Sequence, residues 1–305
     1  MNISDIETFV AVAEAGSVNR AARRLNLTQP AVTRRLQSFE ASLSDAVLLD
    51  RRAKPPVLTP LGRQVLESCR RVLKAVDELK ASSFPGEPTG EFRIGIAHGL
   101  AEVMLSSPLD ALRQRYPRVR LRINANWTIW LVQEIRSGAL DCAIALIDDH
   151  TRLPPGVNAV ALGVEKLVIV AGRDLPLPTA HRPMRLQDLA GHGWILNPLG
   201  CGYRSAVQRV FDREGLALDV AAEVFGHDLQ LSLVARGAGL TLAPRGKFEA
   251  ASDRRRLRIV KVRDLELQST VALLDGGSLG NFAGLVDWLH GRVAARVAIA
   301  HNKYK

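Results

Sequence analysis

Residues 17–39 (SVNRAARRLNLTQPAVTRRLQSF) have the pattern of two short helices joined by a tight turn. Small side chains at Ala21 and Ala22 give the first helix a face that another helix can approach closely. Thr28 is a good N-cap, and Pro30 lies in the first turn of the second helix, where its missing N–H is harmless. The stretch therefore predicts a pair of packed helices.

The second of these helices has two different faces. Val32, Leu36 and Phe39 form an inner apolar stripe at helical spacing. The outer face is polar and basic at its N-terminus, as in a helix-turn-helix whose second helix meets base edges and phosphates. We expect DNA contacts from Ser17, Arg20, Thr28, Gln29, Pro30, Thr33, Arg34 and Arg35. The alternative is an ordinary helical hairpin with solvated arginines.

The charge of the chain favours nucleic acid as a partner. Residues 17–54 hold eight basic and three acidic residues, and the 305-residue chain has a formal net charge of +10 at pH 7. Such an excess favours a polyanion, nucleic acid first and an anionic membrane surface second. No apolar run reaches the ~18 residues of a membrane span. The length is enough for two or three domains.

The N-terminus and the cysteines indicate a cytoplasmic protein. The first residues (MNISDIETF) are acidic and lack the basic leader and apolar core of a signal peptide. They instead predict a helix that opens with a capping box from Ser4 to Glu7 and ends near Gly16. The three cysteines are odd in number and widely separated, which predicts reduced thiols and no disulfide framework.

Residues 47–58 (VLLDRRAKPPVL) contain two short apolar runs around a basic, proline-rich turn. This pattern predicts a β-hairpin wing. In a wing, Arg51, Arg52 and Lys54 would touch the phosphate backbone or a minor groove. The alternative is that these are surface cations placed there by chance.

A long helix is expected from Thr59 and Pro60, a cap followed by proline, to about Ser82. Apolar residues repeat in it at steps of 4, 3, 4 and 3, as in the seam of a short coiled coil. The expected dimerisation residues are Val65, Cys69, Val72, Val76 and Leu79. In the alternative, this helix packs only on its own domain.

After a proline- and glycine-rich linker at 82–90, strands and helices alternate. The expected order is a strand at 92–97, a helix at 103–116, a strand at 119–124, a helix at 128–137 and a strand at 141–147. This order predicts parallel strands with right-handed crossovers. Further strands are expected at 167–172, 193–196, 221–225 and 271–274, and further helices at 203–214, 227–236 and 279–298.

Several short runs match the pattern of one family. In the first half they are Phe9, Ala13, Gly16 and Ser17, Ala21 and Ala22, Leu25, Thr28 to Thr33, Leu36, and Leu58 to Gly62. In the second half they are Arg93 to Ile96, Gly138 to Asp141, Leu186 with Asp188 and Leu189, and Gly237 to Pro244. On these residues the chain resembles the LysR-type transcriptional regulators over almost all of its length. It departs from them at Ser44, where the family usually has glycine.

The resemblance implies an architecture. A winged helix-turn-helix (1–59) and a dimerising linker helix with its hinge (60–90) would precede an α/β effector-binding domain (91–305) of the periplasmic-binding-protein type. That domain would have two Rossmann-like subdomains, at about 91–163 with 267–298 and at about 164–266, with a ligand cleft between them. The implied partners are double-stranded DNA, a small-molecule effector, and copies of the chain in a homodimer or homotetramer, with RNA polymerase as a further partner.

Ligands of open α/β sheets collect at the carboxyl ends of strands. Applied here, this rule nominates four segments, 97–100, 124–128, 199–204 and 225–227, and the same positions line the cleft in the resembling family. The expected effector-binding residues are His98, Gly99, Leu100, Asn126, Trp127, Thr128, Gly200, Cys201, Gly202, Tyr203, Arg204, Phe225 and His227.

The segment from Gly200 to Arg204 is the most informative of the four. Glycines between a strand and a helix expose backbone N–H groups that suit an anion, and Arg204 can add a bidentate contact. We therefore expect a small anion with an apolar or aromatic body. The alternatives are a simple turn with Arg204 in a surface ion pair, and structural roles for His98 and His227. A redox-sensing Cys201 is a further hypothesis.

Enzyme chemistry has no support in the motifs. The sequence has no H-E-x-x-H, G-x-S-x-G, Walker loop or paired-cysteine zinc spacing. We therefore expect no enzyme activity, no metal and no cofactor. The remaining alternative is a small-molecule-sensing or solute-binding α/β module without a DNA-regulatory role.

Overall fold

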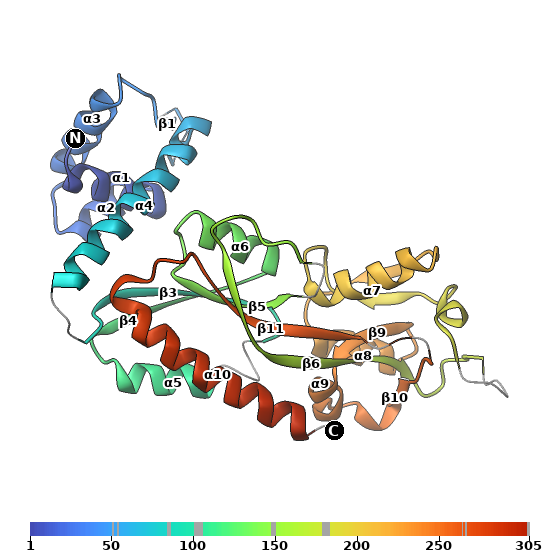
Figure 1. Ribbon diagram of the computed structural model, residues 1–305. Coiled ribbons are helices and arrows are strands. Elements are labelled where there is room, and N and C mark those ends of the chain that lie inside the picture. The colour runs from blue at the N-terminus through green and yellow to red at the C-terminus, as the bar shows by residue number, and fades with distance from the viewer. Residues whose placement is uncertain are drawn as a thin grey trace. The chain divides into compact units, whose positions relative to one another are not determined.

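The computed structural model describes residues 1–50, 52–53, 55–83, 87–100, 106–147, 151–178, 184–263, 265 and 267–303 (Figure 1). They divide into two compact units. The first holds residues 1–87 with the short segments 136–139 and 278–283, and the second holds the rest. The expected fold class, a winged helix-turn-helix and a long helix before an α/β domain, is confirmed.

The first unit is helical with a small hairpin. Its elements are α1 (Ile3–Ala15), α2 (Val18–Leu25), α3 (Gln29–Ser42), β1 (Leu49–Asp50), β2 (Val57–Leu58) and α4 (Pro60–Ser83). The predicted capping box of α1 is wrong by two residues. The Asn2 side chain accepts from the Asp5 N–H at 2.8 Å, and the Asp5 carboxylate accepts from the Asn2 N–H at 3.1 Å, so the helix begins before Ser4.

One apolar core holds these helices together. Phe9 of α1 and Phe39 of α3 are buried, with ring centroids 5.3 Å apart. α4 begins as predicted, because the Thr59 hydroxyl accepts from the Gly62 N–H at 2.9 Å. A Cβ at Gly62 would lie 2.1 Å from the carbonyl oxygen of Leu48, so glycine lets α4 pack directly on the base of the wing.

The second unit is built on one nine-stranded mixed sheet in the order β4-β3-β5-β11-β6-β9-β7-β8, with β10 paired to β6. The strands are β3 (Gly90–Ala97), β4 (Val119–Asn126), β5 (Cys142–Ile147), β6 (Asn158–Gly172), β7 (Trp194–Leu196), β8 (Val220–Glu223), β9 (Leu240–Pro244), β10 (Leu257–Val260) and β11 (Gln268–Asp275). β3 is parallel to β4 and β5, as predicted, and β7 is parallel to β8 and β9. These two parallel sets are the cores of two halves.

Helices cover both faces of this sheet (Figure 1). They are α5 (Ser106–Arg115), α6 (Thr128–Arg136), α7 (Gly202–Arg213), α8 (His227–Ala235), α9 (Arg245–Ala250) and α10 (Ala283–Lys303). In each half the two helices that connect parallel strands, α5 and α6 or α7 and α8, lie on opposite sides of these strands, as right-handed crossovers require. The expected start of α5, at residues 103–105, lies outside the described residues.

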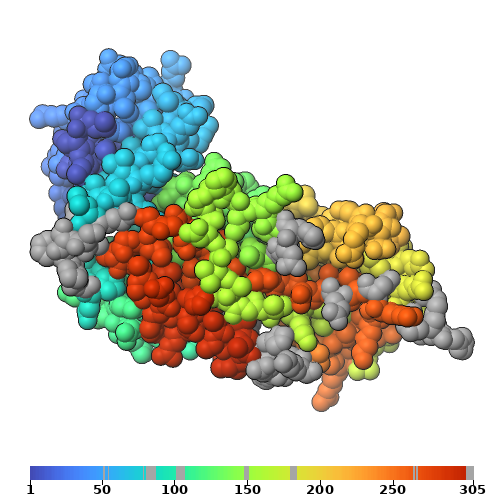
Figure 2. Space-filling model, viewed as in Figure 1, coloured from blue at the N-terminus to red at the C-terminus, as the bar shows by residue number. Residues whose placement is uncertain are grey.

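β6 joins the two halves. Only residues 167–172 were expected as a strand, but β6 is 15 residues long. It pairs antiparallel with β11 up to Lys166, and with β9 from Leu167 on. In Figure 2 the lime residues, where β6 passes between the two halves, lie beside the orange-red C-terminal segment. Gly163, with φ at 152°, interrupts the apolar pattern and hides the first part of the strand from sequence analysis.

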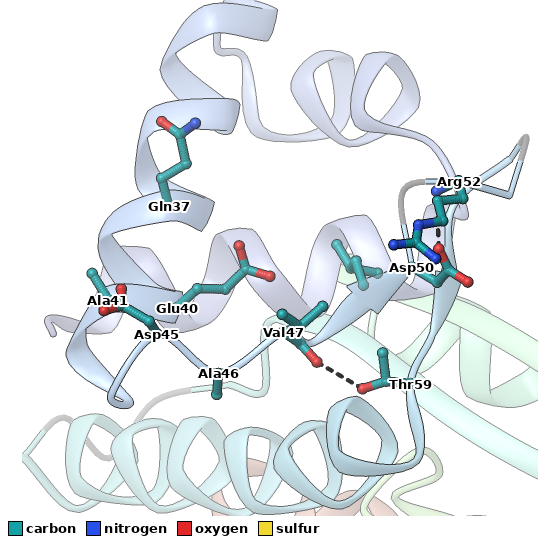
Figure 3. A pocket seen from close by; sticks show the side chains of 10 residues that line it. Gln37, Glu40, Ala41, Asp45, Ala46, Val47, Asp50, Arg52 and Thr59 are labelled. Carbon is teal, nitrogen blue, oxygen red and sulfur yellow. Dashed lines mark hydrogen bonds between the residues drawn. The ribbon is translucent and has the colours of Figure 1, made fainter.

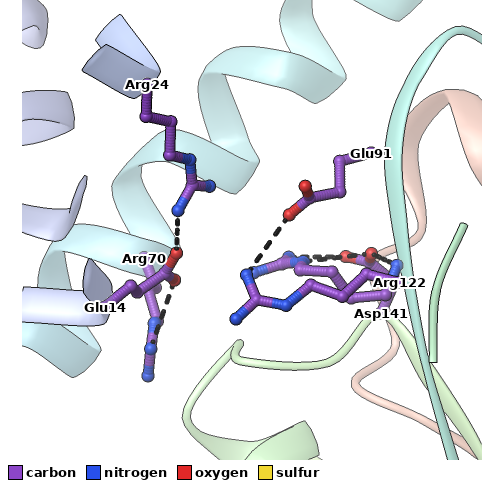
Figure 4. Close-up of polar contacts among 7 residues, drawn as sticks. Glu14, Arg24, Arg70, Glu91, Arg122 and Asp141 are labelled. Atoms are coloured by element: carbon purple, nitrogen blue, oxygen red, sulfur yellow. Dashed lines mark hydrogen bonds and ion pairs between the residues drawn. The ribbon is translucent and has the colours of Figure 1, made fainter. Parts of the chain in front are cut away.

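Two sets of ion pairs each tie elements of one unit together (Figure 4). In the first unit, Glu14 of α1 accepts from Arg24 of α2 at 2.7 Å and from Arg70 of α4 at 3.3 Å. In the second, the Asp141 carboxylate accepts from the Arg93 guanidinium at 2.6 and 3.2 Å and from the Arg93 N–H at 2.7 Å. Asp141 therefore anchors β3 beside the start of β5.

We expect Ser44→Gly to stabilise the first unit. Ser44 has a left-handed backbone with φ at 58°, which costs a residue with a Cβ roughly 1–2 kcal/mol. Glycine avoids this cost, but it loses more conformational entropy on folding, which offsets part of the gain in stability. The expected gain of about 1 kcal/mol is measured as slower hydrogen exchange of the buried α3 amides. Ser38→Gly, in the middle of α3, is the control and should lose about 0.5 kcal/mol. Faster exchange in Ser44→Gly would contradict the strain.

Candidate functional site

The first candidate site is the outer surface of the helix-turn-helix. α2 ends at Asn26, whose left-handed backbone (φ 53°) turns the chain, and the Thr28 hydroxyl caps α3 by accepting from the Ala31 N–H at 3.4 Å. The predicted inner stripe of α3 is buried. Of the expected DNA-contact residues in this motif, Arg20, Thr28, Gln29, Pro30 and Arg34 are exposed, and Ser17, Thr33 and Arg35 are half-buried. The N-terminus of α3 therefore presents its polar side chains away from the core.

The predicted wing is present but short. β1 and β2 pair antiparallel over two residues each. Arg52 follows β1 and is exposed, and its N–H donates to the Asp50 carboxylate at 2.9 Å. Arg51 and Lys54 lie outside the described residues.

A groove of about 700 Å³ lies between the C-terminal half of α3 and the wing (Figure 3). Its lining includes Glu40, Asp45 and Asp50, which are all three acidic residues of the stretch 17–54. The Glu40 carboxylate accepts from the Leu48 N–H at 3.2 Å. Because the acidic side chains gather in this groove, the exposed N-terminal side of α3 holds only neutral and basic residues.

The predicted apolar seam of α4 lies on one face of the helix, and its burial changes along the helix. Val65 and Cys69, in the N-terminal part, pack in the core of the first unit, where Cys69 is 5% exposed. Cys69 is thus a core residue and cannot face a partner helix. Val72 and Leu79, in the C-terminal part, are 44% and 70% exposed, and Val76 is half-buried. Because the N-terminal part of the seam packs within its own unit, only the C-terminal part can take part in assembly.

The second candidate site is a cavity of about 420 Å³ between the two halves of the second unit. It is lined by His98, Gly99, Ala125, Trp127, Asn197, Phe225, Gly226, His227, Asp228, Leu229 and Lys247. These residues lie at or shortly after the carboxyl ends of β3, β4, β7, β8 and β9, where ligands of α/β sheets bind. Five were expected from the sequence: His98, Gly99, Trp127, Phe225 and His227.

Three aromatic rings from both halves meet at this cavity. The ring of His98 lies edge-on to Trp127 and to Phe225, with centroids 4.7 Å away in each case, and the Trp127 and Phe225 centroids are 5.4 Å apart. Burial lowers the pKa of His98, so its imidazole is neutral at pH 7. His98 therefore contributes an aromatic wall and no charge.

His227 is buried, and Gln230 fixes its tautomer. The amide nitrogen of Gln230 donates to the Val224 carbonyl at 2.6 Å, so the amide oxygen is the acceptor that lies 3.2 Å from Nδ1 of His227. This arrangement keeps a proton on Nδ1. Gly99, just after the end of β3, lies beside this ring: a Cβ there would be in van der Waals contact with Nε2 of His227 at 3.6 Å, and its φ of 95° is a backbone conformation that favours glycine.

Arg204 does not line the cavity, contrary to the prediction. Its buried guanidinium donates to the Asn197 carbonyl at 3.1 Å and pairs with the Glu223 carboxylate. It therefore ties β7 to β8 and positions Asn197, whose side-chain oxygen accepts from the Gly226 N–H at 3.1 Å at the cavity. The charge of Arg204 is neutralised within its own half.

The loop before α7 also has a packing role. A Cβ at Gly200 would lie 3.4 Å from the Trp127 ring, and one at Gly202 would lie 3.2 Å from the Leu146 side chain of β5. Gly202 therefore allows close approach of α7 to β5, and Gly200 provides a left-handed backbone with φ at 97°. The expected anion cradle is not part of the cavity lining. Cys201 between them is 1% exposed, and burial raises the pKa of its thiol.

Four other predicted residues belong to the nominated segments but do not line the cavity. Tyr203 is buried and donates its hydroxyl to Glu165 of β6, and burial raises the pKa of Glu165 to about 7. The Thr128 hydroxyl donates to a carbonyl of β5 at 3.0 Å. The Asn126 amide oxygen accepts from the Trp127 N–H at 2.9 Å. Leu100 is 1% exposed. None of the four is among the lining residues.

Ala125 and Gly226 lie within two of the nominated segments, and sequence analysis missed four lining residues: Asn197, Asp228, Leu229 and Lys247. Lys247 follows β9, which is parallel to β7 and so ends at the same edge of the sheet. The run Gly237 to Pro244 was matched to the family but not assigned as a strand, and that assignment would have nominated the residues after it. The Lys247 side chain is 13% exposed, and its ammonium lies 3.7 Å from the Asp228 carboxylate.

Among the described residues, no three His, Cys, Asp or Glu side chains are grouped to hold a metal ion. In the same part of the chain, no helix has the length and apolar character needed to cross a membrane.

Two family profiles match the chain. "Bacterial regulatory helix-turn-helix protein, lysR family" matches residues 3–63, and "LysR substrate binding domain" matches residues 85–274. The chain is 31% identical over 245 residues to the HTH-type transcriptional regulator CzcR of Bacillus anthracis, which is 80% of each protein. It is 30% identical over 279 residues to the HTH-type transcriptional regulator TfdS of Cupriavidus pinatubonensis, covering 90% of this chain and 92% of TfdS.

Solved structures of full-length regulators share the fold. A full-length OxyR variant from Pseudomonas aeruginosa superposes with a TM-score of 0.74 at 19% identity, over 96% of this chain and 94% of that one. Full-length CbnR in complex with its target DNA gives a TM-score of 0.59 at 22% identity, over 98% and 100%. At these identities the likeness concerns the fold alone.

Buried thiols give a direct prediction. Burial raises the pKa of Cys69 to about 11 and also raises that of Cys201, and all three cysteines are buried. We expect no reaction with Ellman's reagent in the folded protein and three reactive thiols after unfolding. Cys201→Ser should lower the second number to two. A fast-reacting thiol in the folded protein that Cys201→Ser removes would instead support redox sensing.

Proposed function

The chain belongs to the LysR family of DNA-binding transcriptional regulators, and we propose that it alters transcription when a small anionic effector binds in the cavity between the two halves of its effector-binding domain. Gln29, Thr33 and Arg34 read bases in this proposal, and Arg51, Arg52 and Lys54 contact the DNA backbone. The observation that carries the DNA-binding part is the acid-free, exposed N-terminus of α3 on a packed helix-turn-helix. A sensing module without a DNA-regulatory role would not need this surface.

The cavity lining supports an anion with an apolar body. His98, Trp127 and Phe225 supply ring surfaces, and Lys247 supplies a cation of low exposure. Lys247 replaces Arg204 as the proposed partner of the anionic group, because the guanidinium of Arg204 is held by Glu223. Asp228 is 80% exposed at its side chain, so it can turn towards solvent when the effector pairs with Lys247.

The proposed mechanism is a population shift. The effector binds the cavity better when the two halves are closed on it, and so raises the population of that state. In a dimer, this change alters the spacing that the two DNA-binding heads prefer. The effector need not create affinity for DNA, and the proposal includes no catalytic step.

LysR regulators form oligomers, and we propose a homodimer through the C-terminal part of the α4 seam, which includes Val72, Val76 and Leu79. A second interface between effector-binding domains would give a homotetramer. The protein would act in the cytoplasm, with RNA polymerase as a further partner on the DNA.

Selection of a preferred site from random DNA, followed by binding measurements, tests the DNA-reading residues. Arg34→Ala should weaken binding to the preferred site by on the order of 1–3 kcal/mol for a lost base contact and relax the preference at one position. Arg213→Ala removes an exposed arginine of α7 (67% at the side chain) and is the matched control, with unchanged binding. If Arg34→Ala keeps the full site preference, the assignment of α3 as recognition helix is wrong.

Val72→Lys tests the assembly. A lysine at this position would place two like charges in a dimer interface, so light scattering at micromolar concentration should show loss of the α4 interface. The product is a monomer, or a dimer held by the effector-binding domains where the second interface forms. The control is Val160→Lys, at an apolar side chain of β6 that is 47% exposed. An unaltered oligomer in Val72→Lys would exclude this part of the α4 seam from the interface.

A further inference from the structure

Exposed apolar side chains gather around the effector cavity. Among the described residues of the second unit, eight large apolar side chains are exposed, and five of them lie in or beside the segments that form the cavity. These five are Ile129 (57%), Trp130 (56%), Leu199 (74%), Phe225 (56%) and Leu229 (55%). They come from both halves of the domain. We call them, together with Trp127, the rim patch.

The rim patch is continuous with the cavity wall. Phe225 and Leu229 line the cavity itself, and the Phe225 ring lies 5.4 Å from that of Trp127. The Trp127 ring and the Ile129 side chain both lie against Gly200, at 3.4 and 3.5 Å from the position of a Cβ there. Leu199 precedes this glycine, and Trp130 follows Ile129. An apolar path therefore leads from the cavity over Trp127 to Ile129 and the loop at Gly200, and the exposed Leu199 is the next residue of that loop.

The size of the cavity gives this path a use. A cavity of about 420 Å³ is within the range of ligand pockets, and Phe225 and Leu229 of the rim patch are part of its lining. A ligand with an apolar body that extends along this wall therefore meets the rim patch. Scattered apolar residues on a surface need no explanation, but a contiguous patch is typical of a binding surface.

We propose that the effector is an amphiphile, with an anionic head in the cavity and a flexible apolar tail that lies over Trp127 and covers Leu199, Ile129 and Trp130. This inference rests on the proposed anion-binding role of the cavity. The tail accounts for the exposed side chains of both halves, and its burial adds apolar contacts only when the halves are closed on the ligand. Each buried methylene of the tail is worth about 0.8 kcal/mol, or about fourfold in affinity.

Titration calorimetry of the full-length protein with butanoate, hexanoate, octanoate and decanoate tests the proposal. Each added methylene that is buried on the cavity wall or the rim patch should tighten binding about fourfold. Leu199→Ser and Ile129→Ser should each weaken decanoate binding tenfold or more and leave butanoate within twofold. Val160→Ser, at an exposed apolar residue of β6 outside the rim patch, is the matched control and should leave the whole series unchanged.

Three results would overturn the proposal that the effector is an amphiphile. Equal affinity for hexanoate and decanoate would remove the tail but keep the anionic head site. No binding at any chain length would exclude both the tail and the anion-binding role of the cavity. The DNA-binding role would still be supported if Arg34→Ala changes the preferred DNA site. A smaller oligomer for Leu199→Ser by light scattering, with an unchanged dependence on chain length, would assign the rim patch to an interface between copies of the chain.

Discussion

The antiparallel pairing of β6 with β11 is the constraint on which the second unit depends. Eight residue pairs, from Gln268 opposite Lys166 to Asp275 opposite Asn158, hold the two strands together in the centre of the sheet. β6 then continues into the other half, where it pairs with β9 and β10. One uninterrupted strand thus carries two sets of parallel strands. Because of it, the carboxyl ends of both sets face a common cavity.

Residues at these strand ends have two kinds of role. Some use their polar groups to fix the ends in place: Arg204 binds Glu223 and a backbone carbonyl, and Thr128 bonds to a carbonyl of β5. Their hydrogen bonds satisfy buried groups that would otherwise cost free energy. Others, such as Trp127 and Phe225, present rings to the cavity. The polar residues shape the site, and the apolar ones give it most of its contact surface.

The first unit depends on local contacts to a greater extent. Its turns are closed by side chains that bond within three residues, as in the Asn2–Asp5 capping box and the Thr28 cap. The exception is Ser44, which has a left-handed backbone where the family usually has glycine. The chain keeps this turn because Phe39 and Leu48 on either side of it are buried in the common core. Packing there outweighs a local conformational cost.

The sequence by itself determined the elements whose signals are local. Helical spacing and caps gave the helix-turn-helix, and the βαβ order gave the parallel strands, because both patterns follow from backbone geometry over a few residues. Only the tertiary structure decided which polar residues face the cavity. Arg204 and Lys247 are both cations after a strand and both meet a carboxylate, but Glu223 and a backbone carbonyl hold Arg204 outside the cavity, whereas Lys247 lies in its lining. Likewise, Cys69 and Val72 follow one heptad pattern, and only the packing of α4 on α1 buries one and exposes the other. Such partners are distant in sequence, so no local pattern can reveal them.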